Sequence, residues 1–366
     1  MRRYAARIPI CDPSQDLLAI QDDILKEVAA KLGWQLSPVQ RERLARRPTQ
    51  DTSAYLEYLE GLHAIHLWTV RDTKRGLDRL ERALARDPSF ALAHASLADA
   101  YIAAAYIFME PRAAFEKARE AAAAALKLDV LLAEAHAAMA TVKFHADWDW
   151  NGAEKDFQEA FRLNPRCAFA HDYYGWYWVA QGKGDRAIAA VEKAVELEPR
   201  SNLYNADLAF VYLHARLPDA AEKQALESLE LDPNNAMAPW ALSLVFAHRD
   251  KDYAAALKQA EIFFQRDKER PDGFALLGWV YGMSGNRDKA QEMLEQLDRL
   301  SGESYIRGEA RAWIYAGMGD KDQAFRCLNQ ACNERSPGII YLKLDQMLDP
   351  LRGDPRLDAL LRRIGV

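Results

Sequence analysis

The sequence predicts an all-α fold, a right-handed α-α superhelical solenoid of about eight helix–turn–helix repeats with capping helices. Closing prolines recur at constant spacing, since Pro165, Pro199 and Pro233 stand 34 residues apart, which is a period of helical repeat proteins. A turn glycine and small residues recur inside the units. The chain of 366 residues is too long for one compact core but suits a solenoid, whose units bury their apolar stripes against their neighbours.

The stretch from Gly175 to Pro199 is the clearest unit. Counted within the repeat, Gly175 stands at the eighth place, Trp178 at the eleventh, Ala187 at the twentieth, Ala194 at the twenty-seventh and Pro199 at the thirty-second. Small residues are needed where the two helices cross closely, and proline ends the second helix because it cannot donate the next backbone hydrogen bond. At these places the chain resembles the tetratricopeptide-repeat (TPR) family, which implies stacked helix pairs.

The same frame predicts the other units in order. The first closes at Pro88 and the second at Val130, where the proline is lost but the helix pattern is kept. Three more close at Pro165, Pro199 and Pro233. The sixth, seventh and eighth units keep the turn and the small residues in looser form, in YAAALKQAEIFFQRD, LLGWVYGMSGNRDKAQEMLEQL and WIYAGMGDKDQAFRCLNQACNERSP.

Two units depart from the period. The second has 20 residues between Ala98 and Ala118 where the repeat has about 12, so roughly two helical turns are inserted, and Pro111 is expected to begin the second helix. The first unit is stretched around LWTVRDT. We expect both insertions to project from the edge of the stack, either as longer helices or as a docking lip.

Charge and hydropathy narrow the function classes. A net charge of −6 and a pI near 5.8 disfavour direct binding of nucleic acid, which needs clustered cations, and the basic stretch Arg41–Arg47 is short enough to be a solvated helix end. No apolar run is long enough to cross a bilayer, and the first residues lack the apolar block of a secretory signal. We therefore expect a soluble cytoplasmic protein without membrane contact, with the periplasm as the alternative.

Neither the histidines nor the cysteines predict a metal or a cofactor. His94, His136 and His171 occupy the fourth place of successive units, so they are expected to lie roughly 10 Å apart, too far to share one ion. We interpret them as packing residues against the neighbouring helix. The cysteines lack metal or redox spacing and are expected to be reduced and mostly buried; they are Cys11, Cys167, Cys327 and Cys332.

Catalytic motifs are also missing, so the sequence predicts that the protein is not an enzyme. It contains no Gly-rich phosphate loop, no nucleophile elbow, no zinc-protease motif and no kinase set. The segment Ala146–Trp150 (ADWDW) lies where the third unit turns between its helices, with one residue inserted, and has two carboxylates two residues apart. Turn formation with burial of the indoles is the favoured interpretation, against a carboxylate pair for acid–base chemistry.

The predicted functional surface is the inner groove, lined by the first helix of each unit. The residue just after the eighth place should point into it, which gives Asp99, Thr141, Trp176, Phe210, Leu244, Trp279 and Trp313. Two interpretations stay open, since these rings either pack between neighbouring first helices or form an apolar peptide-binding groove. Chaperone-binding TPR proteins use lysines and asparagines here to hold a terminal carboxylate, and this sequence lacks them.

A second resemblance covers nearly the whole chain. The order DLLAIQDDILKEVAAKL, SPVQRERLARRPTQDTSAYLEYLEG, the repeats with DWDWNGAEKDFQEAFRLNP, and RSPGIIYLKLDQMLDPLRGDPRLDALLRRIG is similar to the C-terminal part of bacterial TolB-like/TPR regulators. There a winged-helix, cyclase or Ser/Thr kinase output domain precedes the array. The resemblance implies a tail over 1–16, helices of a TolB-like segment over 17–50, a TPR array over 51–336, and a loop with a capping helix over 337–366.

Both ends of the array are expected to be capped by amphipathic helices. At the C-terminus the apolar stripe consists of Leu357, Leu360, Leu361 and Ile364; at the N-terminus it consists of Leu17, Ile20, Ile24 and Val28. The aliphatic run before the last helix, SPGIIYLKLDQMLDP, is expected to pack on the final helix of the array.

Together these observations predict a non-catalytic scaffold that binds a peptide or protein partner in the concave groove and needs no cofactor. One alternative is the sensory or assembly half of a split transcription or cyclic-nucleotide regulator, with the output domain on another chain. A second is a small-molecule enzyme with an unrecognised site in the groove, which is disfavoured because the sequence shows no convergent titratable cluster. The oligomeric state stays open, homo-oligomers included.

Overall fold

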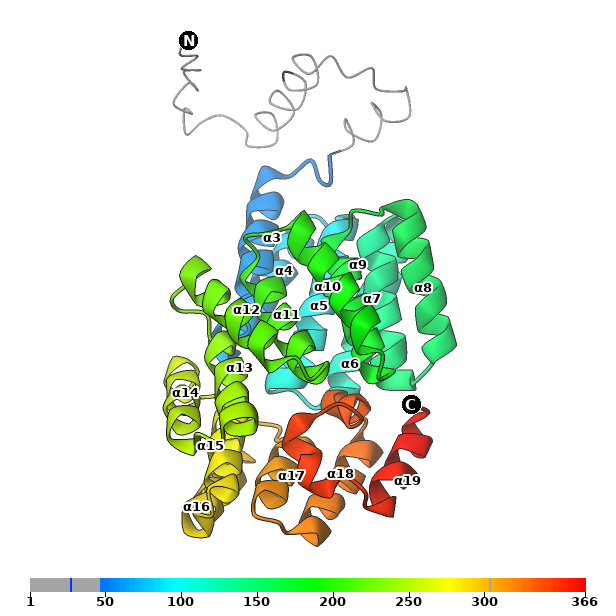
Figure 1. Cartoon of the computed structure of the whole chain (residues 1–366). Coiled ribbons are helices and arrows are strands. Elements are labelled where there is room, and N and C mark those ends of the chain that lie inside the picture. Colours follow the sequence, from blue (N-terminus) through cyan, green and yellow to red (C-terminus); the bar gives the residue numbers. More distant parts are fainter. Residues whose placement is uncertain (1–26, 28–46, 303) are drawn as a thin grey trace, which may run out of the picture.

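The structure, a computed structural model, describes residue 27 and residues 47–302 and 304–366. Within them every regular element is helical (Figure 1). The α-helices are α3 (Thr52–Ile65), α4 (Val70–Arg86), α5 (Ala91–Ile107), α6 (Pro111–Leu128), α7 (Ala133–Val142), α8 (Trp150–Leu163), α9 (Ala168–Ala180), α10 (Gly184–Leu197), α11 (Asn202–His214), α12 (Pro218–Leu231), α13 (Met237–Val245), α14 (Tyr253–Arg266), α15 (Pro271–Met283), α16 (Arg287–Leu300), α17 (Gly308–Gly317), α18 (Lys321–Glu334) and α19 (Pro355–Ile364).

Helices α3 to α18 pack as consecutive pairs, α3 with α4 through α17 with α18, which is consistent with about eight repeats. The expected small residues lie where the helices of a pair cross. A Cβ atom on Gly175, for example, would lie 2.2 Å from Cγ2 of Val191 on the partner helix. Any larger side chain at this place would force α9 and α10 apart.

The turn within a pair uses a left-handed backbone residue at a recurring place. Glycine fills it at Gly182, Gly285 and Gly319, with φ between 72° and 82°. In other units the place holds a larger residue, at a backbone cost of about 1–2 kcal/mol; these residues are Trp68, Trp148, Arg216 and Lys251. Three of the four contact distant parts of the chain, since Trp68 contacts Arg270, Trp148 contacts Arg335 and Arg216 contacts Asp349.

The residue inserted in ADWDW is absorbed by a π-helical turn, η1 (Lys143–Asp147), which extends α7. A second π turn, η2 (Phe246–Asp250), extends α13 in the same way. The two carboxylates of ADWDW are engaged structurally: Asp147 pairs with Arg119 at 2.8 Å, and Asp149 accepts a hydrogen bond from the backbone N–H of Gly152 at the start of α8. This geometry agrees with the turn interpretation.

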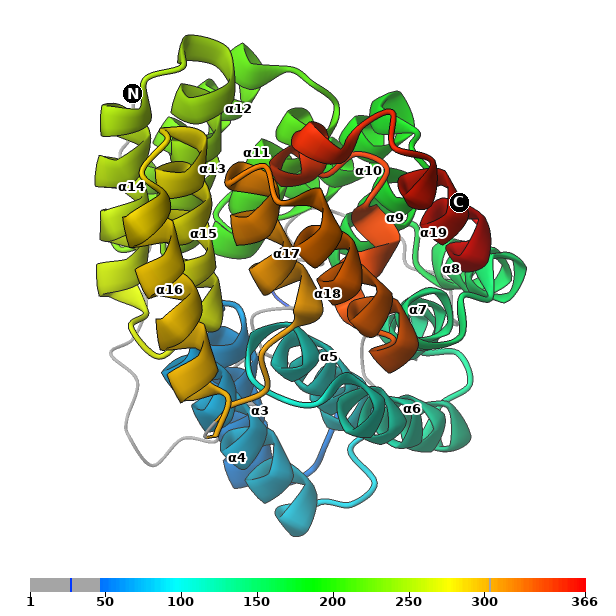
Figure 2. The ribbon, with the colours of Figure 1, turned by 90° about the horizontal axis from the view of Figure 1, so that it is seen from below.

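The superhelix returns to its first pair at the end of the sixth pair (Figures 1 and 2). The backbone N–H of Val70 in the first pair donates to Asp267 at 3.0 Å, and the N–H of Tyr305 donates to the carbonyl of Phe108 at 3.2 Å. Arg112 on the lengthened α6 donates to the carbonyl of Asn333. Helices α5 and α6 are 17 and 18 residues long, which agrees with the longer-helix interpretation of the second insertion. Neither insertion projects freely, since both contact later pairs of the array.

The segment after α18 contacts α18, as expected, but it also contacts α5, α9 and α17. Residues 337–351, here called the inner segment, form two 3-10 turns, η3 (Pro337–Tyr341) and η4 (Gln346–Leu351), and lie inside the superhelix. Their aliphatic side chains are fully buried, namely Ile339, Ile340, Leu342, Leu348 and Leu351. The aliphatic run packs here because the interior of the superhelix offers more apolar surface than one flank of α18.

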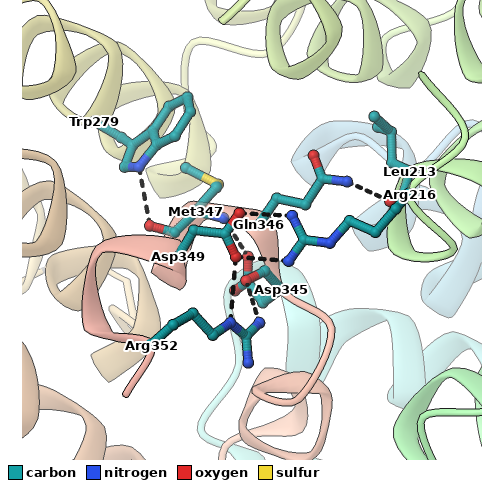
Figure 3. Close-up of polar contacts among 8 residues, drawn as sticks. All are labelled: Leu213, Arg216, Trp279, Asp345, Gln346, Met347, Asp349 and Arg352. Carbon is teal, nitrogen blue, oxygen red and sulfur yellow. Dashed lines mark hydrogen bonds and ion pairs between the residues drawn. The ribbon is translucent and has the colours of Figure 1, made fainter. Parts of the chain in front are cut away.

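Hydrogen bonds from the first helices fix the inner segment in place (Figure 3). The indole N–H of Trp279 donates to the carbonyl of Met347 at 3.0 Å, and the amide of Gln346 donates to the carbonyl of Leu213. Arg216 binds both carboxylate oxygens of Asp349 at 2.6 Å. The last helix, α19, then packs on α18 with its stripe buried or half-buried.

The three histidines at the fourth place of their units make the same hydrogen bond, which the spacing alone did not predict. Each ring Nε2 lies about 3 Å from the carbonyl oxygen six residues earlier, in the preceding turn: His94 to Pro88, His136 to Val130 and His171 to Pro165. In the next unit, the amide of Asn205 donates to the equivalent carbonyl of Pro199. All three histidines are partly exposed, so they anchor turns more than they fill space between helices.

Several expectations concern residues outside the described part, namely the N-terminal stripe, Cys11 and the basic stretch up to residue 46. Of the other cysteines, Cys167 and Cys332 are buried, Cys327 is half-buried, and all three are free. Among the described residues, no helix is both long and apolar enough to span a membrane.

Far-UV circular dichroism is expected to show well over half of all residues in helix and very little strand. The reason is that nearly every unit consists of two helices joined by a short turn. A substantial strand signal from the purified full-length chain would contradict the fold.

Candidate functional site: a central aromatic pocket

A cavity of about 150 Å³ lies at the centre of the superhelix, and we call it the central pocket. Its lining comes from the first helices of most units and from the inner segment. It consists of Trp68, Tyr106, Asp172, Tyr173, Trp176, Leu203, Asp207, Phe210, His214, Met237, Trp240, Leu244, Arg270, Arg307, Trp313, Gly338, Tyr341, Asp345 and Met347. A cavity of this size can hold a group as large as benzene.

The structure brings four of the seven predicted groove residues into this pocket, namely Trp176, Phe210, Leu244 and Trp313. The other three lie elsewhere. Trp279 is fully buried under Met347 of the inner segment. Thr141 is fully buried, and its hydroxyl donates to the carbonyl of Ala137 within its own helix.

Asp99, the remaining predicted residue, lies one layer behind the pocket wall. Its carboxylate accepts a hydrogen bond of 2.6 Å from the hydroxyl of Tyr173. Burial raises the pKa of Asp99 to about 6, although the bond from Tyr173 acts in the opposite direction. Asp99 instead lines a second hollow, together with Tyr58, Phe169 and Tyr204 of other first helices. The expected groove is thus divided into this hollow and the central pocket, and the inner segment fills part of it.

Aromatic rings form most of the wall and contact each other edge to face. Trp240 contacts both Phe210 and Trp313, with centroid separations of 5.6 and 5.9 Å. Trp176 contacts Tyr341 of the inner segment at 5.4 Å. Such pairs contribute about 1 kcal/mol each beyond their buried area, so the wall holds its shape when the pocket is unfilled.

One end of the pocket, here called the acidic end, carries two carboxyl groups that face each other, Asp172 and Asp207. Burial, and then the charge of Asp207, raise the pKa of Asp172 well above its usual range, and burial raises the pKa of Asp207 even though the Trp176 indole acts against it. The two groups titrate as a coupled pair, because ionisation of one disfavours ionisation of the other. Asp172 is 2% exposed, and its Oδ1 has no hydrogen-bond partner.

The other end, here called the arginine end, carries Arg270 and Arg307, which both bind a carboxylate of the protein itself. Asp272, behind the wall, accepts from Arg270 at 2.8 Å and from Arg307 at 2.5 Å. Burial disfavours the ionised carboxylate, but the charges of Arg307 and Arg270 outweigh it and the pKa of Asp272 is lowered. Arg270 also donates to the carbonyl of Trp68, so this ion cluster ties the first unit to the seventh.

A third polar cluster, formed by Tyr106, His145 and Tyr341, joins the second and third units to the inner segment. The hydroxyl of Tyr106 lies 2.5 Å from His145 Nε2 and 3.2 Å from the hydroxyl of Tyr341. The other ring nitrogen of His145 lies 2.9 Å from the carbonyl of Thr141. Burial lowers the pKa of His145 to about 3, so its imidazole is neutral at physiological pH and serves as a fixed acceptor for a tyrosine hydroxyl.

Sequence reasoning missed much of the lining. Trp68, Tyr106, Arg270, Arg307 and Tyr341 do not stand at the groove place of the repeat. One signal was available for Trp68, since a tryptophan at a turn place that favours glycine needs a compensating contact. For the rest, no local pattern distinguishes them from ordinary repeat residues. Among the described residues, no group of three or more His, Cys, Asp or Glu side chains could hold a metal ion.

The acidic end predicts a pH effect on stability. A carboxyl whose folded pKa is raised stabilises the fold fully only below its ordinary pKa near 4, and that contribution is lost as pH rises through the raised value. Buried histidines act in the opposite direction below about pH 6.5, because burial lowers the pKa of His145 to about 3 and that of His66, His214 and His248 to about 4. The effect of the acidic end is therefore expected as a difference: the melting temperature of wild type relative to Asp207→Asn should fall between about pH 5 and about pH 8. Asp207→Asn should be more stable than wild type at the higher pH, by on the order of 1 kcal/mol.

Calorimetry of both chains at the two pH values checks this prediction. Asp288→Asn, a change of the exposed Asp288 on α16, is the matched control. Equal pH slopes for wild type and Asp207→Asn would contradict the assignment of a raised pKa.

Comparisons with known proteins find relatives along part of the chain. No family model matches it. The transcriptional regulator HilA of Salmonella typhimurium is 25% identical over 166 residues, which is 44% of this chain and 30% of HilA. The type IV pilus assembly protein PilF of Pseudomonas aeruginosa is 24% identical over 204 residues, 55% of this chain and 80% of PilF.

Among solved structures, a tetratricopeptide-repeat protein of Parabacteroides merdae superposes with a TM-score of 0.48 at 12% identity, covering 73% of this chain and all of that protein. The described helices α3 to α18 pair in sequence around a superhelical axis with a 34-residue period over Pro165–Pro233. The chain has a tetratricopeptide-repeat fold. It spans less than a third of the length of HilA, so this TPR array matches only one part of that regulator.

Proposed function

We propose that this TPR protein is a non-catalytic scaffold that binds a protein partner at the mouth of the central pocket, with one partner side chain inserted between the aromatic rings. The observation that carries this proposal is the convergence of Trp176, Phe210, Leu244 and Trp313 on one cavity that the inner segment leaves unfilled. Trp176, Trp68 and Asp207 keep part of their surface exposed at the pocket.

The shape of the interior favours an anchor residue over an extended peptide. The inner segment occupies the length of groove that a long peptide would need, and the remaining cavity is about 150 Å³. A deep pocket ringed by aromatic side chains is the usual setting of a binding hot spot, where a few buried contacts supply most of the affinity.

Site-directed photo-crosslinking tests the location. A photo-reactive phenylalanine analogue replaces Trp176 at the pocket or the exposed Lys258 on the outer helix α14. We expect a discrete crosslinked protein from position 176 and none from position 258. The partner is then purified, and Trp176→Ala should weaken its binding by about 2 kcal/mol, the scale of an aromatic hot spot. Crosslinks from position 258 alone, or unchanged affinity of Trp176→Ala, would move the site to the convex face.

Trp279 is unsuitable for this test. Because it is fully buried and its indole binds Met347, Trp279→Ala would cost about 3–5 kcal/mol in folding free energy through the cavity that it leaves. A loss of binding in that variant would not distinguish a contact from a collapse of the inner segment.

One observation favours a second candidate. The alignment with HilA covers 44% of this chain, which supports the sensory or assembly half of a regulator whose output domain lies on another chain. Under this proposal the crosslinked partner carries a DNA-binding, cyclase or kinase domain. Mass spectrometry of the crosslinked product separates the two candidates, since a structural assembly protein without such a domain would contradict the second one.

A further inference from the structure

The central pocket has two ends built from the same parts, aromatic rings with carboxyl groups nearby. At the arginine end, guanidinium groups of the protein itself lie against the aromatic rings. The guanidinium of Arg270 lies within 6.0 Å of the rings of Trp68 and Trp240, and that of Arg307 lies within 5.9 Å of Tyr106 and Trp313. Both cations bind the single carboxylate of Asp272, and the buried Glu309 is a further charge partner of Arg307. Here the chain supplies its own cations to the aromatic rings.

At the acidic end no lysine or arginine fills this role. His214 contacts the rings of Trp176 and Tyr341 there, but burial lowers its pKa to about 4, so it is neutral at physiological pH. Within the described residues, no lysine or arginine stacks on Trp176, Phe210 or Tyr341, although eleven other aromatic rings have such a cation. Oδ1 of Asp172 is buried and without a partner. No basic group is among those that shift the pKa of Asp172 or Asp207.

A buried carboxylate without a partner is costly, and this cost is removed when a cation enters. Aromatic faces attract the same cation through their quadrupole, most strongly where water is excluded. An anion would meet the carboxyl groups at one end and arginines already occupied by Asp272 at the other. A neutral apolar group would leave Oδ1 of Asp172 unpaired.

We propose that the acidic end of the central pocket binds an organic ammonium group, held between the rings of Trp176, Phe210 and Tyr341 and the carboxyl groups of Asp172 and Asp207. The ammonium belongs either to a lysine of a partner protein or to a free alkylammonium compound. The first source rests on the proposed function above, and the second does not. The cavity of about 150 Å³ accommodates either group.

Titration calorimetry on the full chain tests the chemistry with choline and with its uncharged isostere 3,3-dimethylbutan-1-ol. We expect choline to bind and the isostere to bind at least about tenfold more weakly, because only the cation gains from the carboxyl groups. Asp207→Asn should weaken choline binding by about tenfold, while the control Asp288→Asn should not change it. Equal binding of the two probes, no binding of choline, or preferential binding of butyrate would overturn the proposal.

A second arm separates the sources of the ammonium. A short capped peptide with a central lysine is compared with the same peptide containing norleucine, which keeps the alkyl chain but lacks the charge. Lysine-dependent binding that is lost in Asp207→Asn assigns the site to a partner side chain, and binding of choline alone assigns it to a free compound.

The two proposals fail in different ways. If position 176 crosslinks to no protein while choline binds in an Asp207-dependent manner, the partner proposal fails and the ammonium site stands. If a partner is crosslinked at position 176 but choline does not bind and the norleucine and lysine peptides bind equally well, the ammonium site is wrong and the partner proposal stands.

Discussion

Deleting residues 337–366 is expected to remove most of the stability of the protein. The deletion takes away five fully buried aliphatic side chains of the inner segment, namely Ile339, Ile340, Leu342, Leu348 and Leu351. At about 2 kcal/mol for each buried side chain, the loss is on the order of 10 kcal/mol, comparable with the whole stability of an ordinary domain. We expect the truncated chain to melt on the order of 20 °C lower and to aggregate through its exposed concave face.

A point variant keeps this prediction testable when the truncated chain cannot be purified. Leu348→Ala should lower the free energy of unfolding by about 3 kcal/mol. Lys343→Ala, a change of an exposed side chain in the same segment, should leave it unchanged. Thermal denaturation and light scattering of the three chains provide the measurement. A truncated chain that stays monomeric and equally stable would show that the inner segment is only a surface tail.

The second large effect is expected from Asp272→Ala. This change leaves Arg270 and Arg307, which are 2% and 6% exposed, without their shared carboxylate. Removing one partner of a buried ion cluster costs about 3–5 kcal/mol, because the remaining charges stay out of water unpaired. It should also loosen the closure of the superhelix, since Arg270 holds the carbonyl of Trp68 at 2.8 Å.

Urea denaturation measures the loss, and an exposed ion pair supplies the control. Asp298 pairs with Arg311 at 3.0 Å but is 70% exposed, so Asp298→Ala should cost less than about 1 kcal/mol. The cost of Asp272→Ala should be constant from neutral pH down to about pH 4 and shrink below it, since the lowered pKa of Asp272 is then passed and its charge is lost in wild type as well. Similar costs for the two variants would show that the cluster is solvated.

Local sequence was enough to predict the helix pairs and their order. A TPR unit forms when side chains within about 34 residues pack against each other. Gly175 and Val191 do so at the crossing of α9 and α10. The extra residue in ADWDW could likewise be placed in a turn, because a π turn absorbs one residue without disturbing the next unit.

Of the seven residues that the same local pattern assigned to the groove, four line the central pocket and Asp99 lines a second hollow. Thr141 and Trp279 are fully buried. The repeat rule says which face of a helix points inward, but not what else occupies the interior. The inner segment decides that: it covers Trp279 completely and brings Tyr341 beside Trp176. Its buried position could not be deduced from its sequence, because an aliphatic run is equally suited to packing on α18.

By itself, the sequence determined an all-helical repeat array, its period and its turn places, because each of these depends on contacts within one unit or between neighbours. Only the tertiary structure decided that the array closes and encloses a pocket. The contacts that do so join residues 202 and 235 positions apart, Trp68 with Arg270 and Tyr106 with Tyr341. Contacts between residues so far apart in the sequence depend on small rotations between neighbouring units. These rotations add up along the superhelix, and no local sequence pattern encodes their sum.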